Sequence, residues 1–171
     1  LHQELGPLGE LGIKLMPPAV AEASVATVVP FQSVVGEGVF KLLKPGIEAR
    51  MSEELNLLEV VGEHLDASCL ELEIPQLDYQ HAFQQVREKL QEEVRLDHEQ
   101  RHLAQAAVTY EGDQHVLIPA LWPHCTSRVT AMERVYGCKI TDHPHEDDTD
   151  KRRLAELVVD SLIAQPIFSR A

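Results

Sequence analysis

The sequence predicts an α+β fold, and the order of its segments is the main reason. Two valine-rich, strand-like runs lie within residues 25–43, helical patterns follow, short strand-like runs come next, and a last helical pattern closes the chain. Strands and helices that occur in separate groups, instead of alternating, are typical of α+β domains. The size agrees, because 171 residues with 44% hydrophobic and 25% charged residues suit one folded domain, or at most two small ones.

The first half of the chain divides at its glycines and prolines. Residues 1–30 contain many of them, which predicts short helical or extended pieces joined by turns. Within residues 25–43, Gly36-Glu37-Gly38 interrupts the valines, so we expect two strands around a tight turn at that point. Lys44-Pro45-Gly46 ends the second strand. Apolar residues at helical spacing then predict a helix over 47–65, namely Met51, Leu55, Leu58, Val61 and Leu65.

In the second half of the chain we expect two helices with short strands between them. Residues 70–77 are predicted to be a loop or a short strand, and an apolar stripe predicts one long helix over 81–108. Three short strands are expected at 116–118, 129–132 and 139–140. An acidic loop over 142–150 and an amphipathic helix over 151–168 follow, and no internal repeat is present.

The charge and cysteine content narrow the function. Fifteen Lys and Arg stand against 28 Asp and Glu, for a net charge of −13. Such a chain lacks the clustered cations that displace phosphate counterions, so nucleic acid is not expected as a partner. Three scattered cysteines without a CxxC pair indicate a reducing, cytoplasmic compartment. There is no signal-peptide pattern and no run of about 20 apolar residues, and we expect the chain to be a piece of a longer protein.

One short motif suggests zinc chemistry. His98, Glu99 and His102 match HExxH, in which two histidines one helical turn apart bind zinc and the glutamate acts as general base. However, the cation of Arg101 lies inside the motif, and no third ligand follows at an obvious spacing. The tract at 143–148 is rich in His, Asp and Glu and is expected to be a hydrated loop. A zinc-dependent hydrolase therefore remains an alternative, and no metal site is predicted.

A single lysine in an apolar strand suggests a different site. Lys41 lies between Phe40 and Leu42, where a cation must reach the rim of the sheet or find an anionic partner. Taken alone, it is better explained as a charge on an edge strand that limits aggregation. In kinase-type lobes, the partner of such a lysine is a helix glutamate, and the pair holds nucleotide phosphates.

Four motifs, taken together, resemble one family. The stretches are an Ala-rich segment at 21–28, a strand and Pro-Gly turn at 39–47, a helical stretch at 93–102, and Met-Glu-Arg-Val-Tyr-Gly at 132–137. Their order and spacing resemble the UbiB/AarF family of atypical kinase-like proteins, which support isoprenoid-quinone (ubiquinone) biosynthesis. The resemblance covers about residues 11–168. It implies a family extension over 1–24, a protein-kinase-like N-lobe over 25–137 with a small antiparallel sheet and flanking helices, and the start of a C-lobe over 138–171.

The resemblance also implies a site for ATP. Lys41 would contact the phosphates, and Glu99 would hold Lys41, which makes the HExxH match a coincidence. Ala21, Ala23 and Ser24 would cover the phosphates. The backbone of the hinge, which reads MEWVDG in the family, would meet adenine at Met132, Glu133, Arg134 and Val135. The implied partners are nucleotide, quinone-biosynthesis proteins and a membrane surface, to which the protein would be peripheral.

The sequence departs from the family pattern in three places. Lys14 remains from the family's KxGQ motif, but Met16-Pro17 replaces Gly-Gln. Glu93 remains from an ExD motif in which Arg95 replaces the aspartate. The chain ends at Ala171, before the family's catalytic loop and metal-binding aspartate, so we expect no catalytic base here, and Mg²⁺ only if a C-terminal part is present. Within this family, two interpretations of the chain stay open: a fragment of an ATP-dependent kinase or ATPase, and a non-catalytic pseudokinase scaffold.

Overall fold

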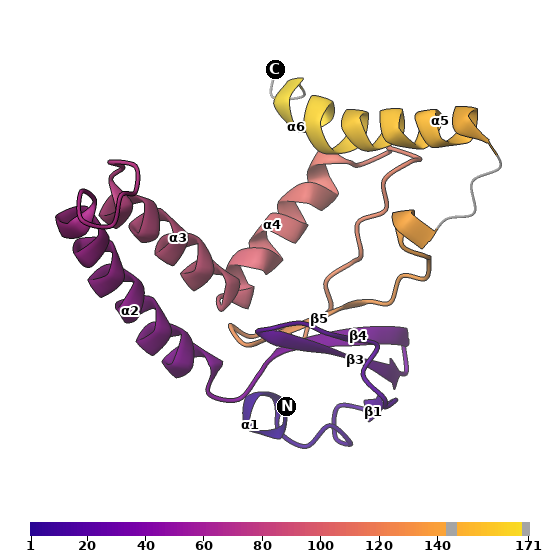
Figure 1. Ribbon diagram of the computed structural model, residues 1–171. Coiled ribbons are helices and arrows are strands. Elements are labelled where there is room, and N and C mark those ends of the chain that lie inside the picture. The colour runs from indigo at the N-terminus through magenta and orange to yellow at the C-terminus, as the bar shows by residue number, and fades with distance from the viewer. Residues whose placement is uncertain (143–146, 169–171) are drawn as a thin grey trace.

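A five-stranded antiparallel sheet organises the computed structural model, which describes residues 1–142 and 147–168 (Figure 1). Its strands are β1 (Lys14–Leu15), β2 (Ala21–Glu22), β3 (Ala26–Ser33), β4 (Gly36–Leu43) and β5 (Val129–Glu133). The order is β1-β3-β4-β5, and β2 also pairs with β3. The long strands β3 and β4 therefore lie in the interior of the sheet, and β5 pairs with β4 although residues 44–128 separate the two strands in sequence.

The two faces of the sheet bury different partners, because side chains alternate along each strand. On one face, Phe31 and Phe40 stack with ring centroids 4.1 Å apart, and Trp122 meets Phe31 edge-on at 5.1 Å. Leu8 and Ile13 from the N-terminal segment complete this core. The opposite face carries a second, smaller cluster.

That second cluster is made by Ala26, Leu43 and Leu96. Leu96 comes from a helix laid against the sheet, and its side chain is fully buried. This contact fixes the start of that helix on the face opposite the phenylalanine core.

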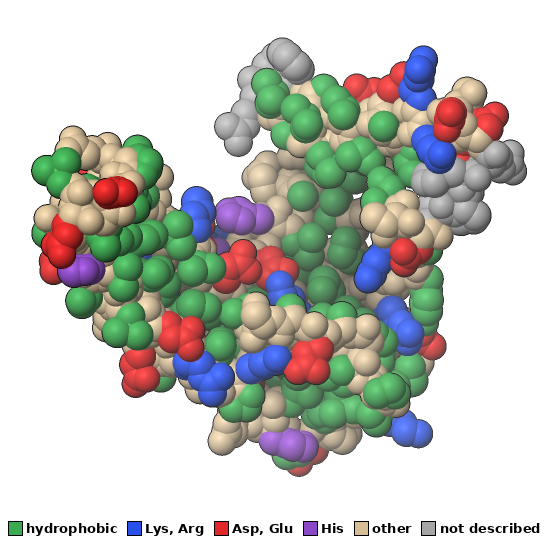
Figure 2. Space-filling view, viewed as in Figure 1, with side chains coloured by type: hydrophobic (Ala, Val, Ile, Leu, Met, Phe, Trp, Pro, Cys, Tyr) green, Lys and Arg blue, Asp and Glu red, His purple; other side chains and the backbone are tan. Residues whose placement is uncertain are grey.

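Two long helices form an antiparallel hairpin that extends away from the sheet. They are α2 (Ile47–Ser68) and α3 (Tyr79–Glu93). Gly62 allows them to approach closely, because a Cβ there would lie 3.1 Å from the Cα of Gln80. Asp66 of α2 accepts hydrogen bonds from the backbone N–H groups of Tyr79 and Gln80. These groups lie in the first turn of α3, where a backbone N–H has no acceptor within its own helix. Large apolar side chains stay exposed on the hairpin, as the green atoms over it in Figure 2 show, and they include Leu57, Val60, Val61 and Val86.

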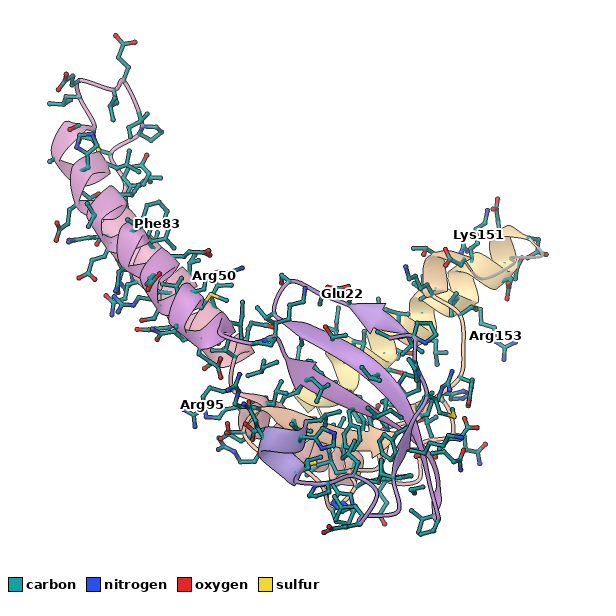
Figure 3. All side chains as sticks on the ribbon, turned by 90° about the horizontal axis from the view of Figure 1, so that it is seen from below. Glu22, Arg50, Phe83, Arg95, Lys151 and Arg153 are labelled. Atoms are coloured by element: carbon teal, nitrogen blue, oxygen red, sulfur yellow. The ribbon has the colours of Figure 1, made fainter. Side chains whose placement is uncertain are left out.

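The other helical elements lie outside this hairpin. They are the short α1 (His2–Leu5), α4 (Leu96–Thr109), a 3₁₀ turn (Ile140–Asp142), α5 (Asp148–Val159), a π-helical segment (Asp160–Ala164) and α6 (Gln165–Phe168). Helix α1 lies on the phenylalanine-core side of the sheet and α4 on the opposite side. From below, the α2–α3 hairpin and the C-terminal helices extend to opposite sides of the sheet (Figure 3). Within residues 1–142 and 147–168, every helix is too short or too polar to cross a bilayer.

The expected long helix over 81–108 is wrong in one respect, because the chain breaks at Val94 and Arg95. The two halves of its apolar stripe have different partners. Phe83 packs against α2 near Gly62, whereas Leu96 packs against Ala26 and Leu43 of the sheet. One straight helix cannot serve both partners, so the chain changes direction between α3 and α4 (Figure 1).

The strand predictions need three corrections. The turn between β3 and β4 is at Val34-Val35, and Gly36-Glu37-Gly38 already belongs to β4. Residues 116–118 are not a strand; the edge of β5 is instead met by 120–122, where Trp122 N–H donates to Ala131 at 2.9 Å. Residues 139–140 are not a strand either, since Ile140 begins the 3₁₀ turn.

The other boundaries are close to expectation. The helix predicted over 47–65 is α2, extended to Ser68, and residues 70–77 form the loop alternative. The last helix begins at Asp148, because the Asp147 carboxylate accepts from the backbone N–H of Asp150 at 2.9 Å and caps it. Of the expected acidic loop, residues 143–146 lie outside the described part of the chain.

Gly38 is needed for a close approach, which gives a first prediction. A Cβ at this position would lie 2.5 Å from Cζ of Phe31 and 3.0 Å from the carbonyl oxygen of Met132. We expect Gly38→Ala to lower the free energy of unfolding by about 1–3 kcal/mol, because the buried ring must shift. Urea unfolding measures this. The control is Gly9→Ala, where a Cβ meets nothing within 4 Å, and an equal loss in both variants would contradict the packing argument.

Candidate functional site

An ion pair between the sheet and α4 forms the centre of the candidate site. Nζ of Lys41 lies 2.5 Å from Oε2 of Glu99, with side-chain exposures of 26% and 45%. Lys41 is in the middle of β4, directly between Val28 of β3 and Thr130 of β5. The alternative that Lys41 is an edge-strand charge is therefore wrong, and the two residues that the sequence singled out as a pair do meet.

Backbone and side-chain hydrogen bonds hold α4 in the position that this pair requires. Nε2 of Gln100 lies 2.8 Å from the carbonyl oxygen of Thr126 and 3.0 Å from both the carbonyl oxygen of Val129 and Oγ1 of Thr130. The N–H of Leu96 donates to the carbonyl of Ser127 at 3.1 Å. Sequence reasoning missed Gln100, because a glutamine inside a helical pattern carries no mark of such a role.

The Ala-rich segment forms a hairpin beside Lys41. Ala21 pairs with Val28 across β2 and β3, and Val28 in turn pairs with Lys41, so the three residues form one row across the sheet. Ala23 and Ser24 lie in the exposed turn, which closes where the N–H of Ala23 donates to Ala26 at 2.8 Å.

A second ion pair ties this hairpin to the end of β4. Lys44 Nζ lies 2.9 Å from Oε1 of Glu22, and its hydrogen bond lowers the pKa of the Glu22 carboxyl. The segment is therefore a strand-turn-strand unit instead of an open loop.

A cavity of about 390 Å³ lies next to this row, between the sheet and the chain that leaves β5. Val28 and Val39 line its sheet side, and Met132 lines the end of β5. All four predicted hinge residues, Met132, Glu133, Arg134 and Val135, border it. Val39 and Lys41 are two residues apart on one strand and so share a face, which puts the ion pair on the same side of the sheet as the cavity.

A larger cavity of about 690 Å³ lies along α2 and α3, and it is lined mainly by polar residues such as Glu59, Gln84 and Arg87. None of the predicted site residues borders it.

Three polar residues meet beside the smaller cavity, and two of them, Arg134 and Tyr136, border it. Nη1 of Arg134 lies 3.6 Å from Oε2 of Glu37, and the hydroxyl of Tyr136 donates to the same oxygen. The guanidinium of Arg134 also lies over the Tyr136 ring, 4.6 Å from its centroid. The hydrogen bond to the Glu37 carboxylate raises the pKa of the Tyr136 phenol. Sequence reasoning missed Glu37 and Tyr136.

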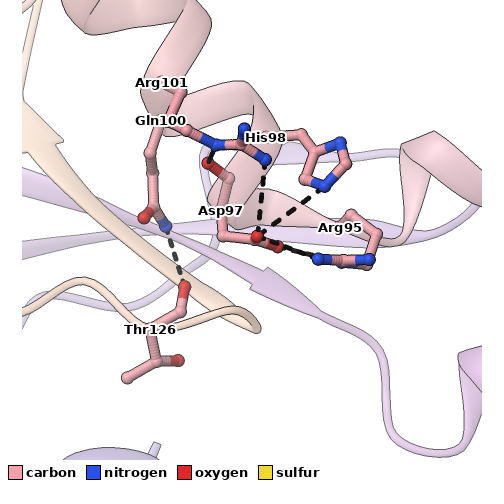
Figure 4. Close-up of polar contacts among 6 residues, drawn as sticks. All are labelled: Arg95, Asp97, His98, Gln100, Arg101 and Thr126. Atoms are coloured by element: carbon pink, nitrogen blue, oxygen red, sulfur yellow. Dashed lines mark hydrogen bonds and ion pairs between the residues drawn. The ribbon is translucent and has the colours of Figure 1, made fainter.

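The three expected motif remnants lie away from the cavity. Lys14 is exposed on β1, and Glu93 is exposed at the end of α3. Arg95 precedes α4, where its Nε and Nη2 donate to Oδ1 and Oδ2 of Asp97, each at 3.1 Å. Arg101 and His98 approach the same carboxylate, both at 3.8 Å, so three side chains converge on Asp97 (Figure 4). The hydrogen bonds from Arg95 lower the pKa of Asp97.

The HExxH motif has other contacts in this fold. Glu99 is engaged by Lys41, and His98 is turned toward Asp97. Among residues 1–142 and 147–168, no group of three or more His, Cys, Asp or Glu side chains is arranged to hold a metal ion. Most of the tract at 143–148 lies outside the described residues.

Gln100 gives a prediction about how α4 is held. Gln100→Ala leaves the hydroxyl of Thr130, which is 1% exposed, without this donor. We expect the free energy of unfolding to fall by about 1–3 kcal/mol in a urea titration. Gln105→Ala, an exposed glutamine on the same helix, serves as control and should change the free energy little. An equal loss in both variants would contradict the assignment, because alanine is the better helix former and propensity alone predicts no loss.

The Asp97 cluster gives a prediction about pH. Arg95 lowers the pKa of Asp97. The interaction therefore stabilises the fold at pH values above the usual aspartate pKa of about 4, and this stabilisation is lost as the pH falls through the lowered pKa. We expect Arg95→Gln to raise the pKa of Asp97, as measured by a carbon-13 NMR titration of its carboxyl group. Arg101→Gln should raise it less, because Arg101 is farther away. An unchanged pKa in Arg95→Gln would contradict the assignment.

The family model of the ABC1 atypical kinase-like domain matches residues 7–170. A protein of Pseudomonas entomophila called probable protein kinase UbiB is 27% identical over 96% of this chain and 31% of its own length. An uncharacterized aarF domain-containing protein kinase of Arabidopsis thaliana, described as chloroplastic, is 30% identical over 83% of this chain and 27% of its own length. The chain thus spans about a third of the length of the curated relatives it matches.

A solved structure supports the fold. The complex of Rv3197 with erythromycin from Mycobacterium tuberculosis matches with a TM-score of 0.65 and 18% identity, over 82% of this chain and 35% of that chain. The prediction of an α+β, kinase-like N-lobe with a small antiparallel sheet is confirmed. With the family model matching nearly every residue from Pro7 onward, the chain belongs to the ABC1 atypical kinase-like family, which includes the proteins named UbiB.

Proposed function

We propose that this part of the protein binds ATP, with the adenine in the 390 Å³ cavity and the phosphates beside Lys41. The observation that carries the proposal is the Lys41–Glu99 pair on the face of the sheet that the cavity shares. A kinase-like family makes nucleotide the expected ligand of such a pair.

The spacing along β4 supports this arrangement. Val39 borders the cavity, and Lys41 follows two residues later, about 7 Å along the strand. An apolar surface for a base is thus followed along the strand by a cation for phosphate. On the other side of the cavity, the N–H groups of Glu133 and Arg134 donate to the carbonyls of Ala120 and Glu37, so we assign the hydrogen-bonding edge of a purine to the backbone at Val135, which borders the cavity.

Glu99 has a positioning role in this proposal. A partly exposed ion pair contributes only about 0–1 kcal/mol to stability, so its use is to direct Nζ of Lys41. The lysine gains a fixed direction, while its remaining N–H groups can contact phosphate oxygens. The turn at Ala23 and Ser24, one strand away, is the part of the chain best placed to cover those oxygens.

The activity of the whole protein extends the same proposal. Phosphoryl transfer or ATP hydrolysis needs Mg²⁺ and an aspartate that holds it. We assign neither a metal ligand nor a catalytic base to residues 1–142 and 147–168, so Mg²⁺ enters only with further residues. The UbiB names of the relatives suggest a role in ubiquinone biosynthesis, with quinone-biosynthesis proteins and a membrane surface as partners.

Within this scheme, residues 25–137 are the nucleotide-binding lobe. Residues 1–24 are a family extension, although Leu8 and Ile13 pack into the core of the sheet. Residues 138–171 begin a second lobe.

A second candidate is a non-catalytic scaffold that binds no nucleotide. Arg95 favours it, because the cation stands where the resemblance implies an acidic residue and is occupied by Asp97. The two candidates differ in one measurable property, which is stabilisation by ATP.

Lys41→Met tests the proposal directly. ATP at a hundredfold excess over its Kd should stabilise the protein by about 2.7 kcal/mol, and a thermal-shift titration detects this as a rise in Tm. We expect Lys41→Met to weaken ATP binding at least about tenfold, because a phosphate contact to a charged group is lost.

The matched control is Lys14→Met, an exposed lysine on β1 outside the cavity, which should keep the ATP-dependent rise. If ATP produces no rise in the unmodified protein, the ATP proposal fails and the scaffold candidate is favoured. If both lysine variants lose the rise equally, Lys41 has no specific role.

A further inference from the structure

Three residues beside the small cavity join the hinge to the strand that carries Lys41. The β4–β5 ladder ends where Gly38 pairs with Glu133. Beyond that point the N–H of Arg134 still donates to the carbonyl of Glu37, at 3.4 Å. The side chains of Arg134 and Tyr136 then both reach Oε2 of Glu37. We call Glu37, Arg134 and Tyr136 the hinge cluster.

The direction of Glu37 makes the hinge cluster relevant to the cavity. Residues 37, 39 and 41 alternate along β4 with residues of the phenylalanine core, so Glu37 shares a face with Val39 and Lys41. One side chain therefore links the chain after β5 to the strand that would contact both base and phosphates. Arg134 and Tyr136 both border the cavity.

Two residues of the hinge cluster differ from the family's hinge motif. Tryptophan and aspartate stand at positions 134 and 136 in the family motif that the hinge resembles, whereas this chain has arginine and tyrosine. An aspartate at 136 would repel Glu37, whereas a tyrosine donates a hydrogen bond to it and also accepts the Arg134 cation over its ring.

We propose that Glu37 is a positioning residue which, through Arg134 and Tyr136, holds the backbone of residues 133–137 in register with β4 and so sets the affinity of the cavity for the adenine ring. The proposal rests on the proposed function, since it concerns the same cavity. Backbone hydrogen bonds to a base weaken steeply when the donor or acceptor drifts, so a loosened hinge loses the base contacts first. Phosphate binding depends on Lys41 and Glu99, which the hinge cluster does not touch.

The test compares two ligands in one protein. The full chain and Glu37→Met are titrated by calorimetry with ATP and with inorganic tripolyphosphate, which has the phosphates but no base. We expect Glu37→Met to weaken ATP binding about five- to tenfold, because an ion pair and a charged hydrogen bond are lost. Tripolyphosphate affinity should stay unchanged.

Two variants separate positioning from general damage. Glu37→Gln keeps an acceptor for the Tyr136 hydroxyl and should recover part of the ATP affinity. Glu53→Gln removes an exposed glutamate from α2 that does not line the cavity, and this variant should bind both ligands as the unmodified protein does. Equal weakening of ATP and tripolyphosphate in Glu37→Met, or unchanged ATP binding, would overturn the proposal.

A ligand-free measurement keeps the proposal separate from the proposed function. Amide hydrogen exchange at residues 134–137 should be faster in Glu37→Met, while exchange along β3 stays the same. If the unmodified protein binds no ATP, the proposed function fails, and unchanged exchange at 134–137 would then refute the hinge cluster as well. If Glu37→Met does not fold, Tyr136→Phe replaces it in both measurements, with a smaller expected loss of ATP affinity.

Discussion

The burial of Leu96 against Ala26 and Leu43 is the contact on which the candidate site depends. It fixes the first turn of α4 on the face of the sheet opposite the phenylalanine core. Glu99 follows one turn later and therefore meets Lys41, and Gln100 reaches the β5 side of the sheet. Without this apolar anchor, an ion pair between two partly exposed side chains would not determine where the helix lies, because such pairs contribute little free energy.

Apolar and polar contacts have the same two separate roles throughout the molecule. Apolar contacts set the positions of the elements: Phe31 on Phe40 across one face of the sheet, Leu96 at α4, and the close approach at Gly62 between α2 and α3. Polar contacts then direct individual groups within that frame, as Asp66 does at the start of α3. Polar residues therefore decide the chemistry of the site, and apolar residues decide its location.

Strand β4 joins the two parts of the site. Its position between β3 and β5 gives it neighbours on both sides, which removes backbone freedom from Val39 and Lys41. The cavity, the lysine and the hinge contact to Glu37 are all carried by this one strand. A ligand that bridges the proposed base and phosphate sites on this strand would meet a geometry that is formed before it binds, which lowers the ordering cost of binding.

Composition and spacing were enough to predict the α+β class, most of the helices and the strand pair within residues 25–43, because helical spacing and strand composition are properties of neighbouring residues. The pairing of Lys41 with Glu99 came from the family resemblance. The break at Val94 and Arg95, the turn at Val34-Val35, and the contacts of Gln100, Glu37 and Tyr136 became apparent in the folded structure alone. Gln100 meets Thr126 across 26 residues and Tyr136 meets Glu37 across 99, so no local pattern marks either contact. The helix break has the same cause: α3 and α4 continue one apolar stripe, but α2 and the sheet lie in different directions, and that difference exists only once the chain has folded.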